Sequence, residues 1–283
     1  KNIQALGLDG LLTLGGDDTN SVSFRLQQDH PEFLVIGLPK TMDNDIDLPY
    51  GASTYGFDSF VQASVKLVQN GIVDVRSTNR ILVVESFGRS AGFAPLRIRE
   101  LVKASRTLIP EEHNIDLEKL LFDLSIYHQQ NGYGAVVVSE GVKIQKNFAN
   151  NAEIMERAFA KDPVAKIAFE NVSELDAFGH PKLQNAGMII AAILKTGLKD
   201  KKIDISPAGK LDYLVRSAPI SEIDRVMCEL VGQSGVERLV AGEHDVLLYV
   251  ANNKVESLKL TPNLGGRAVD INGKDREEFL MAN

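Results

Sequence analysis

Two short apolar runs, each leading into a loop of glycines and charged residues, constrain this chain most strongly. The first run covers residues 9–14 and the second covers residues 33–38. Apolar runs of this length are typical of strands buried on both faces, as in a parallel sheet. Loops at the carboxyl ends of such strands are where ligands bind. The sequence therefore predicts that four carboxylates and one lysine converge on a crevice: Asp17, Asp18, Asp43, Asp45 and Lys40.

The remainder of the chain continues this alternation of apolar runs and helix-like stretches. Strands are expected at 80–85, 106–109 and 134–139, with helices at 55–76, 92–104 and 116–130. Such alternation predicts βαβ units, a parallel sheet and right-handed crossovers.

A second helical series is expected further along the chain, at 152–170, 183–197 and 219–240, and is followed by a hairpin of 244–250 and 255–260. Residues 198–212 are charged and rich in turn formers, so we expect a linker or a surface excursion there.

Composition narrows the classes of partner. The 283 residues carry a formal net charge of −7 with no basic stripe and no tryptophan, which argues against nucleic acid. No apolar run approaches the length that a bilayer requires, so no membrane partner is expected. The single cysteine, Cys228, excludes an intrachain disulfide and fits a reducing, cytoplasmic location. The first strand begins almost at once, and the chain is therefore expected to begin part-way through a domain.

The two loops have the composition that phosphoryl transfer requires. The glycine pair Gly15-Gly16 allows the backbone to approach a ligand, and the helix that follows favours phosphate at its N-terminus. Mg²⁺ is usually held by one or two carboxylates together with water and substrate phosphates. In the second loop, Asp43 is suited to accept a proton from a hydroxyl, while Lys40 offsets phosphate charge. A capped glycine turn and a solvated turn are the simpler alternatives.

Three later segments add candidates for binding an anion or a sugar. Arg89 follows the strand at 80–85, where it can stabilise charge on a transferring phosphoryl group; a surface salt bridge is the alternative. Glu140 ends the strand at 134–139 and suits either a sugar hydroxyl or a helix cap. Arg216 lies just ahead of a helix, a good position for an anion, although exposed arginine is the commoner explanation.

Together these loops resemble the phosphofructokinase family, from about Leu6 through Gly242. The stretch 9–20 is similar to the family's donor-phosphate and metal loop, and 39–46 to its catalytic loop. The stretch 80–89 resembles a third signature, and 139–141 the strand end that holds the sugar. The resemblance is specific because these motifs occur in order at family-like separations.

The resemblance implies a role for each site residue. Asp43 would be the general base with Thr41 beside it, and Arg89 would stabilise the transferring group. Mg²⁺ would be bound by Asp17 and Asp45. The donor site would include Gly16, Asp18 and Lys40, and the sugar-phosphate site Arg80, Gly88, Glu140, Tyr213 and Arg216. Arg80 would reach the 6-phosphate site of a neighbouring subunit, which implies a homo-oligomer, at least a dimer.

The donor is expected to be pyrophosphate, because the ATP-using branch of the family usually has glycine where this chain has Asp18. The implied reaction is reversible transfer to the 1-hydroxyl of fructose 6-phosphate, a step of glycolysis and gluconeogenesis. An ATP-dependent 6-phosphofructokinase is the nearest alternative. A non-catalytic regulatory subunit is another, motivated by the absence of the family's glycine-rich loop before Lys1 and by unusual residues near Arg216.

The expected fold is α/β with two Rossmann-like lobes, mostly parallel sheets and an active site in the cleft between them. The phosphoryl-donor lobe is expected to comprise 1–53 and 214–262, and the sugar-phosphate lobe 54–213 and 263–283.

Overall fold

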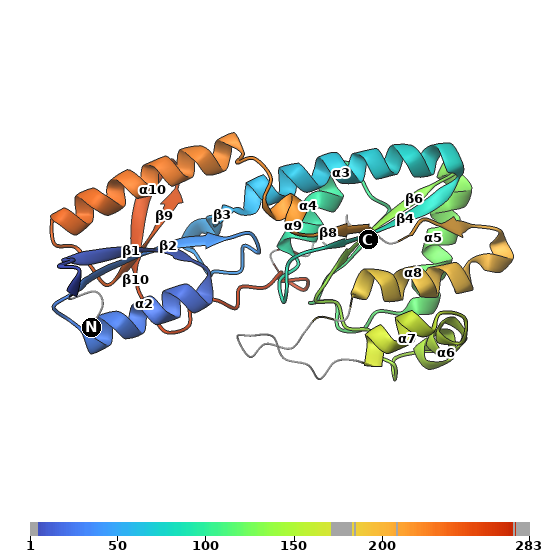
Figure 1. Cartoon of the computed structure of the whole chain (residues 1–283). Helices are drawn as coiled ribbons and strands as arrows, with labels where there is room; N and C mark the ends of the chain where they lie inside the picture. Colours follow the sequence, from blue (N-terminus) through green and yellow to red (C-terminus); the bar gives the residue numbers. More distant parts are fainter. Residues whose placement is uncertain (1–4, 171–182, 184, 208, 274, 276–283) are drawn as a thin grey trace. The chain divides into compact units, whose positions relative to one another are not determined.

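The computed structural model describes residues 5–170, 183, 185–207, 209–273 and 275 (Figure 1). The chain divides into two compact units. Unit 1 comprises 1–60 and 219–267, and unit 2 comprises 61–218 and 268–283. Both are α/β with parallel pairing dominant, so the predicted fold class is confirmed. The unit boundaries follow residues 60, 218 and 267, whereas the sequence predicted boundaries after 53, 213 and 262.

Unit 1 is built on a five-stranded sheet with the order β1-β2-β9-β10, in which β3 also pairs with β2. The strands are β1 (Gly10–Gly15), β2 (Leu34–Thr41), β3 (Tyr55–Gly56), β9 (Val246–Ala251) and β10 (Lys254–Lys259). All pairings are parallel except the β9–β10 hairpin. The helical elements are α2 (Asp17–Asp29), the 3₁₀ turn η1 (Pro49–Gly51) and α10 (Glu222–Val240).

Helices α2 and α10 cover opposite faces of this sheet (Figure 1). Alternate residues of β2 therefore face different layers, as a strand's period of two requires. Val35 packs in the layer that includes Phe24 of α2, whereas Ile36 packs with Val231 of α10. Because β2 is buried on both faces, its run of apolar residues is continuous rather than alternating.

Unit 2 is built on a second five-stranded sheet with the order β5-β6-β4-β7, in which β8 also pairs with β4. Its strands are β4 (Arg80–Ser86), β5 (Arg106–Leu108), β6 (Gly134–Ser139), β7 (Asp204–Ile205) and β8 (Gly209–Leu211), and all pairings are parallel. The helices are α4 (Phe93–Val102), α5 (Leu117–Asn131), α6 (Asn151–Lys161), α7 (Pro163–Glu170), α8 (Ala186–Gly197), η2 (Lys199–Lys201) and α9 (Tyr213–Arg216). Helix α3 (Phe57–Thr78) begins in unit 1 and continues into unit 2.

The largest core of unit 2 lies between its sheet and helices α5, α6 and α8. Ile81, Val136 and Val138 meet Leu120 of α5 and Ile190 of α8 in this cluster, and all five side chains are buried. The apolar strands predicted from the sequence thus form the centre of the unit, because each supplies side chains to a covered face.

Two details of the predicted elements were wrong. The helix expected over 152–170 is two helices, since Asp162 precedes Pro163 and the residue before a proline avoids the helical region. The segment 198–212 is not a linker, because β7 and β8 within it extend the sheet beside β4. Of the helix expected over 183–197, residue 184 lies outside the described residues.

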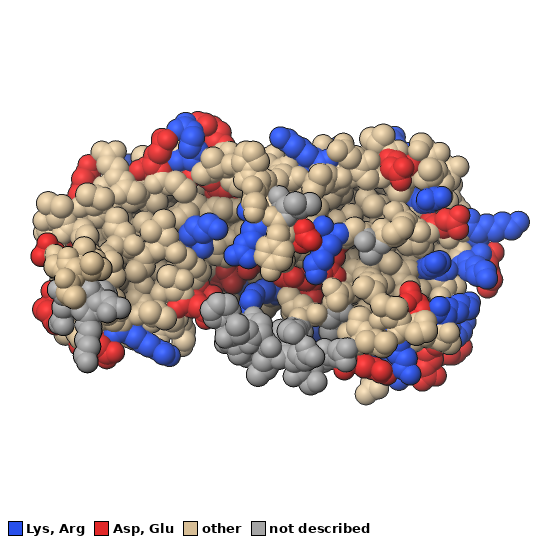
Figure 2. Space-filling view, viewed as in Figure 1, with Lys and Arg blue, Asp and Glu red and all other residues tan. Residues whose placement is uncertain are grey.

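Groups of Lys and Arg and groups of Asp and Glu are both scattered over the face drawn in Figure 2. Among the described residues, no helix is both long and apolar enough for a bilayer crossing.

The buried side chain of Asn151 ties three separate segments of unit 2 together. Its amide donates to the carbonyls of Ile115 (2.9 Å) and Gln145 (2.8 Å), and its Oδ1 accepts the N–H of Leu117 (3.0 Å). We predict that Asn151→Ala lowers the free energy of unfolding by about 3 kcal/mol, because buried backbone groups lose their partners. Urea denaturation measures this. The neighbouring exposed Asn150, changed to Ala as the control, should cost less than about 1 kcal/mol; equal losses would contradict the prediction.

Candidate active site

The two predicted loops of unit 1 begin side by side. Strands β1 and β2 run parallel, and Gly15 at the end of β1 is in register with Pro39 of β2. Asp17 and Asp18 lie in the first turn of α2 and are exposed. Gly16 is the N-cap residue, with no side chain capping the helix. Neither aspartate is therefore the N-cap residue, and both lie exposed in the first turn of the helix.

Asn20, to which the sequence analysis gave no role, holds the glycine turn. Its side-chain amide donates to the carbonyl of Gly15 (3.0 Å) and to that of Gly16 (2.8 Å), and the residue is fully buried. Both carbonyls belong to the turn between β1 and α2. The buried amide therefore fixes the backbone that presents Asp17 and Asp18.

The second loop is held by its own side chains. Thr41 Oγ1 accepts the N–H of Asp43 (3.1 Å), and the Thr41 carbonyl accepts the hydroxyl of Thr54 (2.8 Å). Asn44, whose φ of 57° is left-handed, accepts the N–H of Thr54 (3.0 Å). Asparagine tolerates this conformation better than most residues. The turn that carries Asp43 and Asp45 is thus shaped locally rather than being a solvated excursion.

A later segment, 264–267, lies against both loops of unit 1 and escaped the sequence analysis. A methyl group on Gly265 would lie 2.6 Å from Cβ of Asp17. The N–H of Arg267 donates to the carbonyl of Asp45 (2.9 Å), and its guanidinium donates to the carbonyl of Ala52 (3.3 Å). This segment therefore lies beside both predicted metal ligands. No periodic pattern in the sequence predicts that position.

The donor set of unit 1 fits a hard cation shared with a phosphate ligand. Among the described residues, no group of three or more histidine, cysteine or carboxylate side chains could hold a metal by itself. Mg²⁺ does not require such a cage, because it takes one or two carboxylates with water and substrate phosphates. Asp17 is exposed, Asp45 is half-buried, and Lys40 at the end of β2 is an exposed cation.

In unit 2, the loops after β4 and β6 approach closely. Glu140 donates its backbone N–H to the carbonyl of Ser86 (2.9 Å), and its carboxylate accepts the N–H of Arg89 (3.4 Å). Only glycine fits at position 141, because a Cβ there would lie 1.6 Å from the carbonyl oxygen of Arg89. Arg89 itself has a left-handed φ of 41°, a backbone strain that the surrounding contacts must hold.

The buried position of Glu140, which is 7% exposed, raises the pKa of its carboxyl. The N–H of Arg89 and the charge of Lys210 act in the opposite direction, and the charge of Glu85 raises it further. While it stays ionised, a carboxylate so placed accepts hydrogen bonds from a polyol at both oxygens, whereas protonation would make one of those oxygens a donor.

The structure brings some of the predicted sugar-site residues of unit 2 together and separates another. The ring of Tyr213 meets that of Phe87 edge-on, with centroids 6.1 Å apart, so α9 lies beside the loop that contains Gly88 and Arg89. Arg216 ends α9 and is exposed. Arg80 begins β4, roughly 20 Å from the strand's other end at about 3.3 Å per residue. Arg80 thus lies far from the other residues of its own unit's site.

The loop after Arg89 is closed by a residue that the sequence analysis also missed. Glu111, which is buried, accepts the N–H of Gly92 (2.9 Å) and that of Val269 (2.8 Å). Burial raises the pKa of this carboxyl, and the two backbone donors oppose that rise.

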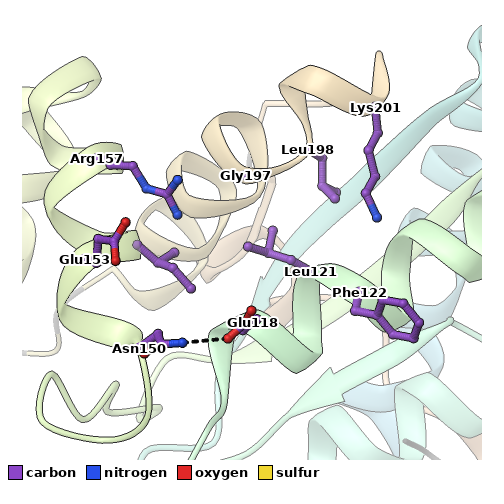
Figure 3. A pocket seen from close by; sticks show the side chains of 10 residues that line it. Glu118, Leu121, Phe122, Asn150, Glu153, Arg157, Gly197, Leu198 and Lys201 are labelled. Carbon is purple, nitrogen blue, oxygen red and sulfur yellow. Dashed lines mark hydrogen bonds between the residues drawn. The ribbon is translucent and has the colours of Figure 1, made fainter.

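A surface hollow of about 360 Å³ in unit 2 contains none of the predicted site residues (Figure 3). Two of the charged side chains that line it are hydrogen-bonded within the protein: Glu118 accepts a hydrogen bond from Asn150 (2.8 Å), and Lys201 donates to Ser125 (2.6 Å). A ligand site needs polar groups that converge on the ligand. The loops at the strand ends meet that description better than this hollow does.

These features carry a clear family likeness. The Phosphofructokinase family model matches residues 1–239. The chain belongs to the phosphofructokinase family.

Among curated relatives, a pyrophosphate–fructose 6-phosphate 1-phosphotransferase of Naegleria fowleri is 27% identical over 91% of this chain and 60% of its own length. The protein of the same name from Thermotoga maritima is 28% identical over 97% of this chain and 67% of its own length. An ATP-dependent 6-phosphofructokinase of a Sulfurihydrogenibium species is 28% identical over 90% of this chain and 65% of its own length. The chain thus spans about two thirds of the length of these relatives.

A pyrophosphate-dependent phosphofructokinase structure from Nitrosospira multiformis matches with a TM-score of 0.69 at 21% identity, covering 99% of this chain and 68% of that one. The corresponding structure from Marinobacter aquaeolei matches with a TM-score of 0.66 at 20% identity, covering 91% of this chain and 60% of that one. At these identities the likeness establishes the fold.

The amide of Asn20 gives a testable prediction for unit 1. In Asn20→Asp, a carboxylate of equal shape cannot donate to the carbonyls of Gly15 and Gly16, so we expect the free energy of unfolding to fall by about 3 kcal/mol at pH 7. Because the buried carboxyl of the variant would have a raised pKa in the folded state, its stability should recover as the pH falls. Urea denaturation at pH 5 and pH 7 measures both effects.

The control is Asn147→Asp at an exposed position, which should change little at either pH. A variant at position 20 as stable as the wild type at pH 7 would show that the amide does not hold the turn.

Proposed function

We propose that the protein containing this chain catalyses reversible, Mg²⁺-dependent phosphoryl transfer from pyrophosphate to the 1-hydroxyl of fructose 6-phosphate, in cytoplasmic glycolysis and gluconeogenesis. Unit 1 would bind the phosphoryl donor and unit 2 the sugar phosphate. Family membership supports the reaction class. The names of most relatives compared favour this donor, and those proteins are 26–30% identical to this chain.

The observation that carries the choice of donor is the pair of adjacent carboxylates in the first turn of α2. Asp18 is exposed beside Asp17, where the ATP-using branch usually has glycine. A carboxylate about 4 Å from a nucleotide phosphate costs roughly 1–4 kcal/mol, depending on the local dielectric. The side chain also occupies space that a nucleotide would need. Gly16 and Lys40 would contact pyrophosphate from the ends of β1 and β2.

Asp43 is the proposed general base. Its backbone is fixed by Thr41, which would keep the carboxylate in place to accept the proton of the sugar hydroxyl as that oxygen attacks phosphorus. Asp17 and Asp45 would hold Mg²⁺, which when bound offsets charge on the phosphate oxygens.

The sugar phosphate would be bound by residues of unit 2. Arg89 would stabilise the charge on the transferring group, with Gly88 giving its backbone close access. Glu140 would accept hydrogen bonds from sugar hydroxyls, and Tyr213 and Arg216 would bind the 6-phosphate.

Arg80 would serve the site of a neighbouring subunit. Its position at the amino end of β4, away from the residues above, supports this assignment. The active form would therefore be a homo-oligomer, at least a dimer.

A parallel assay of the full-length protein with pyrophosphate and with ATP tests the proposal. We expect turnover with pyrophosphate, and formation of pyrophosphate from phosphate and fructose 1,6-bisphosphate, because the two phosphate compounds have similar transfer potential. The ATP-dependent alternative rests on the relative of that name. Preference for ATP would support that alternative, and failure with both donors would reject catalysis by this protein.

Asp43→Asn should lower kcat by about 10²–10⁴-fold, because the amide cannot accept the proton. KM for fructose 6-phosphate should change much less, since the substitution preserves shape. Steady-state kinetics with pyrophosphate measures this, with Asp58→Asn of α3 as the control. A loss of less than about fivefold would remove Asp43 from the chemistry.

Asp18→Gly should raise kcat/KM for ATP relative to pyrophosphate by about tenfold or more, because it removes both the charge and the bulk of the carboxylate. The ratio of the two specificity constants is the measurement. Asp29→Gly at the other end of α2 is the matched control. An unchanged ratio would mean that Asp18 does not select the donor.

A further inference from the structure

A buried carboxylate, Glu85, lies at the end of the central strand of unit 2. It is 3% exposed and directly follows the four apolar residues 81–84 of that strand. Its Oε2 accepts the N–H of Gly187 (2.8 Å) in the first turn of α8. Helix α8 begins from Asn185, which has a left-handed φ of 53° and gives no side-chain cap. The carboxylate of Glu85, on strand β4, thus caps the N-terminus of α8. A negative charge is favourable at a helix N-terminus.

Only a residue without a side chain allows this contact. A Cβ on Gly187 would lie 2.8 Å from Cβ of Glu85. The close approach of α8 to β4 is therefore built into the packing.

Lys210 forms an ion pair with Glu85. Strand β8 pairs with β4 so that Lys210 is in register with Glu85, and Lys210 Nζ lies 2.8 Å from Glu85 Oε1. The same ammonium donates to Asn185 Oδ1 at 3.4 Å. A buried carboxylate without such a partner would be strongly unfavourable. The Lys210 side chain is 43% exposed, so solvent partly screens the action of its charge on the groups around it.

Those groups include a proposed sugar ligand. The charge of Lys210 acts on Glu140 after β6 and on Asp212 after β8. The groups that face Glu140 are the carboxylate of Glu85 on β4, the ammonium of Lys210 on β8 and the backbone N–H groups of the Gly88–Arg89 loop. Three carboxylates thus share one ammonium at the carboxyl edge of this sheet.

We infer that Lys210 is a positioning residue of the sugar-phosphate site: its ammonium neutralises Glu85 at the start of α8 so that the neighbouring Glu140 can receive sugar hydroxyls as a carboxylate. This inference rests on the proposed function, and assigns Lys210 no contact with substrate. Without the ammonium, the negative charge of Glu85 would act on Glu140 without the opposing effect of Lys210. The Glu140 pKa, already raised by burial, would rise further.

The test compares variants of the full-length protein. In Lys210→Met the charge is lost and the stem is kept, whereas in Lys210→Arg the charge is kept. Fructose 6-phosphate binding by calorimetry, kcat and KM would be measured between pH 5.5 and 8.5, with melting temperatures as the check on folding. Lys195→Met, at an exposed lysine of α8, is the matched control.

We expect Lys210→Met to move the acid limb of fructose 6-phosphate affinity to higher pH by about one unit, which is a loss of about tenfold at the acid end. The loss should appear in KM more than in kcat and should shrink at pH 8. Lys210→Arg should restore most of the affinity. The double variant Lys210→Met/Glu85→Gln should also move the acid limb back, because the charge that opposed Glu140 is gone.

The outcomes separate this inference from the function on which it rests. A wild type that binds fructose 6-phosphate, together with a Lys210→Met variant of unchanged KM and pH dependence, would overturn the inference alone. A pH-independent loss in Lys210→Met that the double variant does not relieve would also overturn it, since that is the signature of a structural role. If Lys210→Met does not fold, the pH dependence of fructose 6-phosphate affinity would be measured in the double variant instead. A wild type that neither binds nor phosphorylates the sugar would overturn the proposed function and this inference with it.

Discussion

The buried amide of Asn20 is the interaction on which the candidate donor site depends most. Strand β1 ends beside β2, and its backbone must turn within two glycines to start α2. The side-chain amide of Asn20 donates to both carbonyls of that turn from inside the fold. The turn can then stay narrow while Asp17 and Asp18 remain exposed. Glycine loses more conformational entropy on folding than other residues do, so a glycine turn needs such support to keep one conformation.

In unit 2, buried carboxylates rather than an amide hold the backbone near the strand ends. Buried carboxylates lie at or just after the carboxyl ends of its strands: Glu85, Glu111 and Glu140. Each accepts at least one backbone N–H, so each organises the chain around it. Lys210 adds a cation that acts on two of them, Glu85 and Glu140. The same carboxylates that shape the loops therefore set the electrostatics of the proposed sugar site.

The sequence predicted the elements that have a clear physical signature. Apolar runs such as 33–38 indicated buried strands because both faces of those strands are covered, and the loops that follow them could be located at once. Strands β7 and β8 were missed because two or three residues are too few to show a period. The contacts of Asn20, the Glu85–Lys210 pair and the approach of Gly265 to Asp17 depend on register and long-range packing, which no local pattern encodes. A charged residue directly after four apolar residues of a strand, as at Glu85, was the one available signal.

The central claim is that the paired ends of β1 and β2 hold the phosphoryl donor. Hydrogen–deuterium exchange of the full-length protein, followed by mass spectrometry with and without Mg²⁺ and pyrophosphate, tests it most directly. The account predicts slower exchange in peptides covering 15–20 and 40–47 when both ligands are present, with fructose 6-phosphate alone slowing 86–92 and 139–142 instead. Unchanged exchange in the first two segments at saturating pyrophosphate, or protection there by a nucleotide and not by pyrophosphate, would contradict it.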